Sequence, residues 1–257
     1  MREVGLQRAI DAAGGVSALA HALGIAQPSV SGWTRVPADR VAAIEAAIGV
    51  ARTTLRPDLY AAPAQAPLDD IDVARTRTYH LLAHLLANPP TQALLDSVGE
   101  ITGDASPLGL AWIALADAAR QTTATAAGEE FFKLFIGVGR GDVLPFASYY
   151  QAGFLHERPL SAIRADLAGL GIERSTGVHE PEDNVATLFD AMAAMIDGSC
   201  EAPLSAQDAF FAAHIEPWVD RLFADILVAP SAKFYRAVAD VGRHWIDLET
   251  RATSIAA

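Results

Sequence analysis

A cluster of carboxylates in the second half of the chain has the character of a cation-binding surface. The run reads Glu180-Pro181-Glu182-Asp183-Asn184. Carboxylates pair with guanidinium groups through charge-assisted hydrogen bonds that fix orientation, so this run would suit an arginine-bearing peptide. The alternative is local: proline fits the first position of a helix, and carboxylates in the first turn stabilise the positive end of the helix dipole. That alternative predicts a helix that starts at Pro181.

Side chains that could hold a metal or perform catalysis are few, and their spacing is poor. His80 and His84 lie four residues apart, but two imidazoles without a third ligand make a weak metal site. Serine, histidine and aspartate occur without the glycine-framed turn of a catalytic nucleophile. The glycines of residues 137–141 lack the lysine of a phosphate-binding loop. We therefore expect no enzyme activity, no cofactor and no metal.

Polar and basic side chains in the first sixty residues could read DNA. They follow a short helix and a glycine turn, which is the arrangement of a helix that enters the major groove. Glutamine and serine there form hydrogen bonds with base edges, and arginines neutralise phosphates. The residues expected to contact DNA are Gln27, Ser29, Ser31, Arg35 and Arg40.

Charge is divided unevenly along the chain. Residues 1–57 hold six arginines and four carboxylates, a net charge of +2, so the remaining residues must carry −14 of the chain's total of −12. The first segment can approach phosphate, whereas the second repels nucleic acid and favours cationic partners. The single cysteine, Cys200, excludes an intramolecular disulfide and fits a reducing cytosol. With no signal-peptide pattern and no apolar run of membrane-spanning length, we expect a cytoplasmic protein without membrane insertion.

Helical periodicity organises the whole chain. Alanine is abundant and strand-like alternation of apolar and polar residues is nearly absent, which favours an all-α fold. Glycine and proline divide the N-terminal segment into four to five helices. We expect a helix-turn-helix domain at residues 1–60, a semi-stiff linker rich in alanine and proline at 61–70, and a larger all-helical bundle at 71–257.

The last helix of the bundle has the cleanest amphipathic pattern. Its apolar residues recur at intervals of four and three residues, which predicts one buried face. Ser231 precedes this helix and has a side chain typical of an N-cap. The buried face would comprise Phe234, Val238, Val241, Trp245 and Leu248.

Three stretches of the first sixty residues form a specific pattern. They are Gly15-Val-Ser-Ala-Leu-Ala-His-Ala-Leu-Gly-Ile-Ala-Gln-Pro-Ser-Val-Ser-Gly-Trp33, Val36-Pro-Ala-Asp-Arg40 and Leu55-Arg-Pro-Asp-Leu-Tyr60. This pattern resembles the phage Cro-type repressors, and most of all their YdaS-like branch. The resemblance implies sequence-specific binding to double-stranded DNA as a homodimer on a palindrome. The alternative is a helical domain that has kept the shape and lost the DNA, which the small net charge would suit.

Residues 72–250 carry a second ordered set of motifs. The set comprises Glu130–Gly139, Leu144–Tyr150, Gly153–Leu155, Glu180–Asp183, Phe210-Phe211 with His214, Pro217-Trp218 and Phe234-Tyr235. These motifs resemble the TorD/DmsD family of chaperones for molybdenum redox enzymes. One departure is Asn184, where the family usually places a histidine, because asparagine cannot take a charge near neutral pH.

The second resemblance implies that the bundle binds the twin-arginine signal peptide of a redox-enzyme precursor and delays export until the molybdenum cofactor is loaded. The expected client is a formate dehydrogenase. His214 and Trp218 would fix the helical packing. The peptide-binding residues that the resemblance implies are Pro145, Tyr149, Gly153, Glu180, Asp183 and Asn184.

Two functional hypotheses follow. The first is a maturation chaperone with a DNA-binding head. The second is a helix-turn-helix transcriptional regulator whose helical body acts as a sensor or an oligomerisation domain. Protection of DNA upstream of the gene would favour the second hypothesis, and capture of a precursor leader would favour the first.

Overall fold

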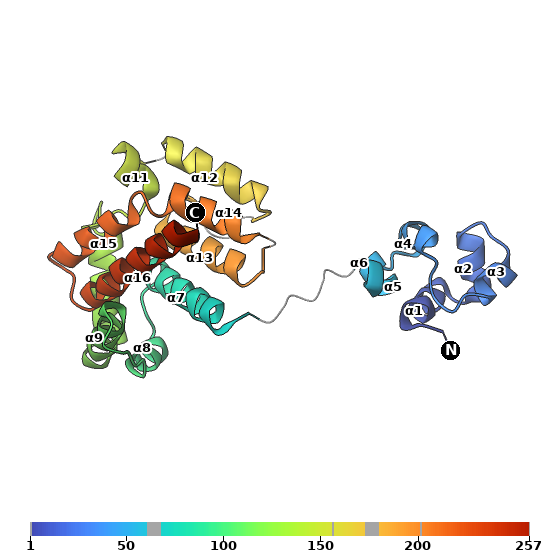
Figure 1. Cartoon of the computed structure of the whole chain (residues 1–257), viewed down its shortest axis with the longest axis horizontal. Helices are drawn as coiled ribbons and strands as arrows, with labels where there is room; N and C mark the ends of the chain where they lie inside the picture. Colours follow the sequence, from blue (N-terminus) through green and yellow to red (C-terminus); the bar gives the residue numbers. More distant parts are fainter. Residues whose placement is uncertain (1, 61–67, 156, 173–179, 201, 257) are drawn as a thin grey trace. The chain divides into compact units, whose positions relative to one another are not determined.

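The computed structural model describes residues 2–60, 68–155, 157–172, 180–200 and 202–256. The chain divides into two compact units, Met1–Pro67 and Leu68–Ala257, which we call the head and the body (Figure 1). Every regular element in the described ranges is helical, beside one isolated antiparallel bridge between Phe146 and Asn184. The predicted all-α fold is confirmed. Most of the predicted linker, residues 61–67, lies outside the described residues.

The head follows the predicted succession of short helices. The first helix ends at Ala13, because Gly14 adopts a left-handed backbone with φ of 84°. The expectation of four to five helices falls short, since residues 52–60 form two further single turns. The elements are α1 (Val4–Ala13), α2 (Val16–Ala22), α3 (Gln27–Ser31), η1 (Ala38–Arg40), α4 (Val41–Ile48), α5 (Arg52–Leu55) and α6 (Pro57–Tyr60).

The end of the head is tied to its beginning by close backbone packing and by one buried arginine. A Cβ atom on Gly5 would lie 2.2 Å from the carbonyl oxygen of Leu55, so glycine lets α1 approach α5. The guanidinium of Arg56 is buried, donates to the carbonyl of Val36 at 2.7 Å and donates to both carboxylate oxygens of Asp58 at 2.7 Å. The motif at residues 55–60 therefore holds the domain together.

The body contains ten α-helices and one π-helical turn in its described residues. Its first helix ends before Pro89-Pro90, and an irregular loop separates the π turn from the next helix. The elements are α7 (Asp70–Ala87), α8 (Gln92–Gly99), α9 (Pro107–Gln121), α10 (Ala124–Phe131), η2 (Phe132–Ile136), α11 (Ala147–Ala152), α12 (Arg158–Gly169), α13 (Val185–Ile196), α14 (Leu204–His214), α15 (Val219–Val228) and α16 (Phe234–Ala256) (Figure 1).

Helix α13 lies at the centre of the body. It packs along α7, while α16 packs against α15 and α9. Nine of its 12 residues are buried, so α13 is surrounded on most sides and does not merely cover one face. Tyr79 of α7 packs edge-on against Phe189 and Trp245, each at 5.4 Å between ring centroids. Gly242 gives α16 its close contact with α15, since a Cβ there would lie 2.2 Å from the ring of Phe223.

The apolar stripe of α16 is buried for most of its length and then leaves the core. Phe234, Val238, Val241 and Trp245 are buried as predicted. Leu248, the fifth member, is 47 % exposed, so the prediction that it belongs to the core is wrong. The last turns of α16 therefore present an apolar side chain outside the core.

The start of α16 is satisfied by a distant carboxylate. Glu130 of α10 accepts the backbone N–H groups of Lys233, Phe234 and Tyr235 at 2.6, 3.1 and 2.7 Å. The prediction that Ser231 caps this helix is wrong, because its hydroxyl donates to Asp142 instead. The first N–H groups of a helix have no acceptors within the helix. At the start of α16 the carboxylate of Glu130, about a hundred residues earlier in the chain, accepts their hydrogen bonds.

Candidate functional site

The acidic run at residues 180–184 takes part in a junction between two helix starts. Asp183 caps α11 from outside that helix: its carbonyl accepts the N–H of Ala147 at 2.9 Å, and its carboxylate accepts the N–H of Ser148 at 3.0 Å. Asp183 is only 1 % exposed, so its carboxylate lies in the interior of the body. Asp183 thus serves as the N-cap that α11 lacks in its own sequence.

Asn184 caps the second helix at this junction. Its Oδ1 accepts the N–H of Ala186 at 2.9 Å, and its Nδ2 donates to Glu180 at 2.8 Å. The N–H of Val185 donates to the carbonyl of Pro145 at 2.9 Å. Together with the hydrogen bond from Ala147 to Asp183, it pairs the backbone just before α11 with the backbone just before α13. We call residues 145–148 and 183–185 the double-cap junction. Asparagine suffices at this position because the cap needs an acceptor and a donor and needs no charge.

The local prediction of a helix that starts at Pro181 is wrong. Asn184 donates its N–H to the carbonyl of Pro181 at 3.1 Å in a turn, and α13 begins only at Val185. The side-chain oxygen of Asn184 favours a helix start at Val185, because it accepts the N–H of Ala186 and so caps α13.

The six residues predicted to bind peptide divide into two sets. Pro145, Asp183 and Asn184 are buried, so their side chains support the junction and do not face solvent. Tyr149 is partly exposed, and Gly153 and Glu180 are exposed. Direct contact with peptide stays a prediction for all six, and the geometry favours an indirect, positioning role for the buried three.

Aromatic and basic side chains surround the exposed part of the junction. The guanidinium of Arg140 lies 5.2 Å from the ring centroid of Tyr149 and donates to its hydroxyl at 2.9 Å. Arg164 donates to Glu182 at 2.7 Å across the surface. Phe154, directly after α11, is 72 % exposed. This rim offers an aromatic ring and apolar area to a ligand, but its carboxylate Glu182 already has a cationic partner.

His214 and Trp218 have the packing role that the sequence predicts. The indole N–H of Trp218 donates to the carbonyl of His214 at 2.7 Å, and both side chains are buried. The imidazole Nε2 of His214 lies 2.6 Å from a carboxylate oxygen of Asp166 on α12. The ring of Trp218 stacks on Tyr150 at 5.3 Å. These contacts join α12, α14 and α15 behind the junction.

A second candidate surface is a groove of about 730 Å³ in the body, and no motif of the sequence predicts it. The starts of α7, α9 and α14 and the end of α16 form it, and we call it the α7/α16 groove. Its apolar lining residues are Ile71, Leu108, Trp112, Leu204, Trp245 and Leu248. Its carboxylates are Asp70, Asp72, Asp208 and Glu249, beside one guanidinium, Arg75. The signal in the sequence is the stripe of α16, which runs beyond the core at Leu248.

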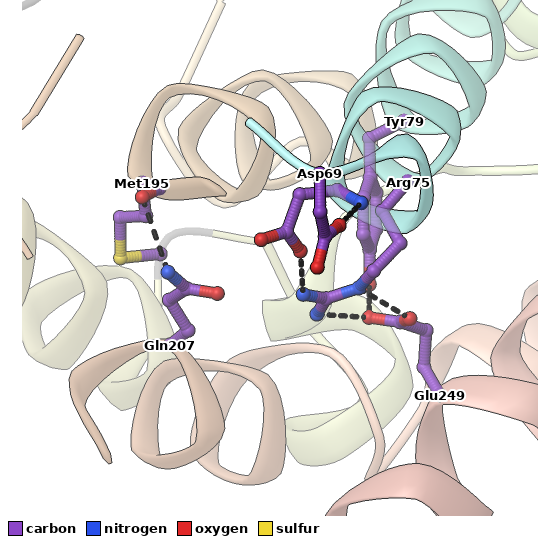
Figure 2. A network of polar contacts seen from close by, with 7 residues as sticks. Asp69, Arg75, Tyr79, Met195, Gln207 and Glu249 are labelled. Atoms are coloured by element: carbon purple, nitrogen blue, oxygen red, sulfur yellow. Dashed lines mark hydrogen bonds and ion pairs between the residues drawn. The ribbon is translucent and has the colours of Figure 1, made fainter. Parts of the chain in front are cut away.

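A polar network braces one wall of the α7/α16 groove (Figure 2). Glu249 accepts two hydrogen bonds from Arg75 at 3.0 and 2.9 Å and one from the hydroxyl of Tyr79 at 3.0 Å. Arg75 also donates to Asp72 at 3.1 Å. The carboxylate of Asp69 caps α7 by accepting the N–H of Asp72 at 2.8 Å. The network fixes the start of α7 against the end of α16.

The charges in this network shift the pKa values of its members. Burial by itself would lower the pKa of the Arg75 guanidinium, but the hydrogen bonds and charge of Glu249 outweigh it and raise the pKa. Burial raises the pKa of the Tyr79 hydroxyl well above its usual value, and the charge of Glu249 raises it further. Arg75 therefore stays cationic and Tyr79 stays neutral, so both remain donors to Glu249.

The five residues predicted to contact DNA are all exposed in the head. Gln27 and Ser31 lie on the same face of α3, since Nε2 of Gln27 donates to the hydroxyl of Ser31 at 2.7 Å. Arg35 lies 3.9 Å from Glu3 and 3.8 Å from Asp58, so carboxylates partly neutralise it. Val30 of α3 is buried. The face of α3 that carries Gln27 and Ser31 is exposed.

Comparison with known proteins bears on both units. Residues 102–224 match the family model described as nitrate reductase delta subunit, and residues 6–64 match the model described as bacterial toxin YdaS. The chaperone protein TorD from three strains of Vibrio cholerae serotype O1 is 29 % identical to 39 % of this chain. The body is similar to TorD. The two resemblances predicted from the sequence are thus confirmed.

The extent of these matches is limited. The chain spans about half the length of the TorD relatives, since the match covers 50 % of each. No group of three or more potential metal ligands comes together within the described residues. Helices of the described ranges all fall short of the length and apolarity that crossing a membrane requires.

Removal of the Asp183 side chain tests the double-cap junction. We expect Asp183→Ala to lower the free energy of unfolding of the body by about 1–3 kcal/mol, because α11 loses its cap and the N–H of Ser148 loses its acceptor. Urea denaturation of the full chain measures the change. The matched control is Asp96→Ala, an exposed aspartate on α8, for which we expect a change within about 0.5 kcal/mol. Equal effects of the two substitutions would contradict the capping role.

Proposed function

We propose that the body is a cytoplasmic chaperone, without enzyme activity, for the precursor of a molybdenum redox enzyme. It binds the twin-arginine signal peptide of that precursor and holds the protein back until its cofactor is loaded. The observation that carries this proposal is the similarity of the body to the nitrate reductase delta subunit model and to the chaperone TorD. Those comparisons support a redox-enzyme maturation chaperone, and the nature of the client is our extension.

The charge of the body suits this partner. The residues beyond 57 carry a net charge of −14, because residues 1–57 contribute +2 to the total of −12. A leader with paired arginines is cationic at its start and apolar in its middle, so an acidic surface attracts and orients it. We propose the exposed members of the predicted set, Tyr149, Gly153 and Glu180, as contacts at the surface, and the double-cap junction as their support.

Calorimetry with a synthetic leader tests the chaperone proposal. We expect the full chain to bind the leader of the host's formate dehydrogenase precursor, the proposed client, with a dissociation constant in the micromolar range. We also expect affinity to fall by about tenfold or more when both arginines are replaced by glutamine, because charge-assisted pairs are lost. Leaders of the host's other molybdenum-enzyme precursors identify the client if this one does not bind. Failure of every such leader to bind would overturn the proposal.

We further propose that the head binds double-stranded DNA as a homodimer. The match of residues 6–64 to the YdaS model and the exposed face of Gln27 and Ser31 on α3 support this role. Gln27 reads a base edge in this proposal, with Ser29 and Ser31 beside it, while Arg35 and Arg40 contact phosphates. The alternative function, a transcriptional regulator with a sensing or oligomerising body, rests on the same observation.

Footprinting upstream of the gene tests the head. We expect protection that weakens with added salt and an affinity loss of about tenfold or more for Gln27→Ala, because one good base contact is worth about 1–3 kcal/mol. The matched control is Gln7→Ala on α1, whose side chain is bonded to Asp11 away from the reading helix. Protection without any leader binding would favour the regulator. Absence of protection at low salt would contradict DNA binding.

A further inference from the structure

The α7/α16 groove has an apolar wall that no described residue of the body covers. Leu248 continues the stripe of α16 that is buried up to Trp245, yet it is 47 % exposed. Across the groove, Ile71 of α7 and Leu204 of α14 are 70 % and 58 % exposed. Large apolar side chains scattered singly are ordinary on protein surfaces, but several around one groove mark a binding site. The stripe thus predicts burial at Leu248, and the described residues of the body do not supply it.

The charge of the groove specifies what that molecule carries. Four carboxylates and one guanidinium line the groove, a formal charge of −3. Arg75 is already held by Glu249 and Asp72, so these three form a closed internal set. Asp70 and Asp208 have no hydrogen-bonding or ionic partner among the described residues. Two carboxylates without cations beside an apolar surface fit an apolar ligand that bears positive charges at one end.

A rigid frame keeps the groove open. The network of Glu249, Arg75 and Tyr79 joins α7 to α16 (Figure 2), and Glu249 and Arg75 also line the groove. Asp69 fixes the first turn of α7, which carries Asp70 and Ile71. Binding to a pre-formed surface loses less conformational entropy than binding that must first order the surface. The groove therefore combines apolar area, free carboxylates and a fixed shape.

We propose that the α7/α16 groove is the seat of the client leader: its apolar stretch packs on Ile71, Leu204 and Leu248, and its arginines pair with Asp70 and Asp208. This inference rests on the proposed chaperone function and adds a second contact surface for the leader, in addition to the proposed contacts Tyr149, Gly153 and Glu180. A peptide with arginines followed by an apolar stretch matches the groove, because the groove offers carboxylates to the arginines and apolar side chains to the stretch. A second copy of the chain matches it less well, because two surfaces of charge −3 would repel each other.

Fluorescence anisotropy with the full chain tests this site. The probe is a labelled synthetic peptide of two arginines followed by a leucine- and alanine-rich stretch. We expect a pair of apolar substitutions, Ile71→Gln with Leu248→Gln, to weaken binding by about tenfold or more. A charge pair, Asp70→Asn with Asp208→Asn, weakens binding and flattens its dependence on salt. All four positions are outside the core, so the variants fold, and circular dichroism checks that they do.

Matched controls locate the effect. Val228→Gln changes another apolar side chain that is 78 % exposed, and Asp117→Asn changes an exposed carboxylate on α9; neither lines the groove. We expect both to bind the probe like the unmodified chain. If the groove variants also bind normally, or if only Tyr149→Ala and Glu180→Gln weaken binding, the groove inference is overturned while the chaperone proposal stands.

Two further outcomes would count against the groove. If the unmodified chain binds neither the probe nor any precursor leader, the chaperone proposal itself fails and the groove falls with it. If sedimentation shows self-association that Leu248→Gln abolishes, a second copy occupies the groove instead of a leader. Weakened binding in both groove pairs with unchanged controls is the result that supports the inference.

Discussion

Backbone N–H groups at the starts of two body helices donate to carboxylates of residues far away in the chain. The packing of the body depends on these hydrogen bonds. Glu130 serves three such groups at the start of α16, and Asp183 serves two at the start of α11 through its carboxylate and its carbonyl. A buried helix end without acceptors would be costly, because each unsatisfied group loses its hydrogen bond to water. The caps therefore fix which helices meet and at what point along their length.

This constraint explains which features of the fold the sequence predicts. Apolar periodicity is a local signal, so the stripe of α16 up to Trp245 follows from the sequence alone. A cap supplied by a distant residue has no local signal. For that reason Ser231 is a wrong cap for α16, and the run that begins at Glu180 is a turn and not the start of a helix. The resemblances to known families, by contrast, depend on ordered motifs and hold for both units.

The same distinction between local and distant contacts separates the two candidate sites. The acidic run is conspicuous in the sequence, yet its most conspicuous member, Asp183, faces inward as a cap. The α7/α16 groove is assembled from four helices far apart in the chain, and a stripe cannot reveal whether another helix will cover its last member, Leu248. The body thus separates two tasks: the double-cap junction holds α11 and α13 in place, and the groove presents apolar area and free carboxylates to a partner.

Hydrogen–deuterium exchange of the full chain, with and without a bound arginine-bearing leader, tests most directly where the body receives its client. We expect slower exchange in the first turns of α7 and the last turns of α16, which line the groove. Slower exchange confined to residues 147–153 and 180–185, with α7 and α16 unaffected, would contradict this expectation.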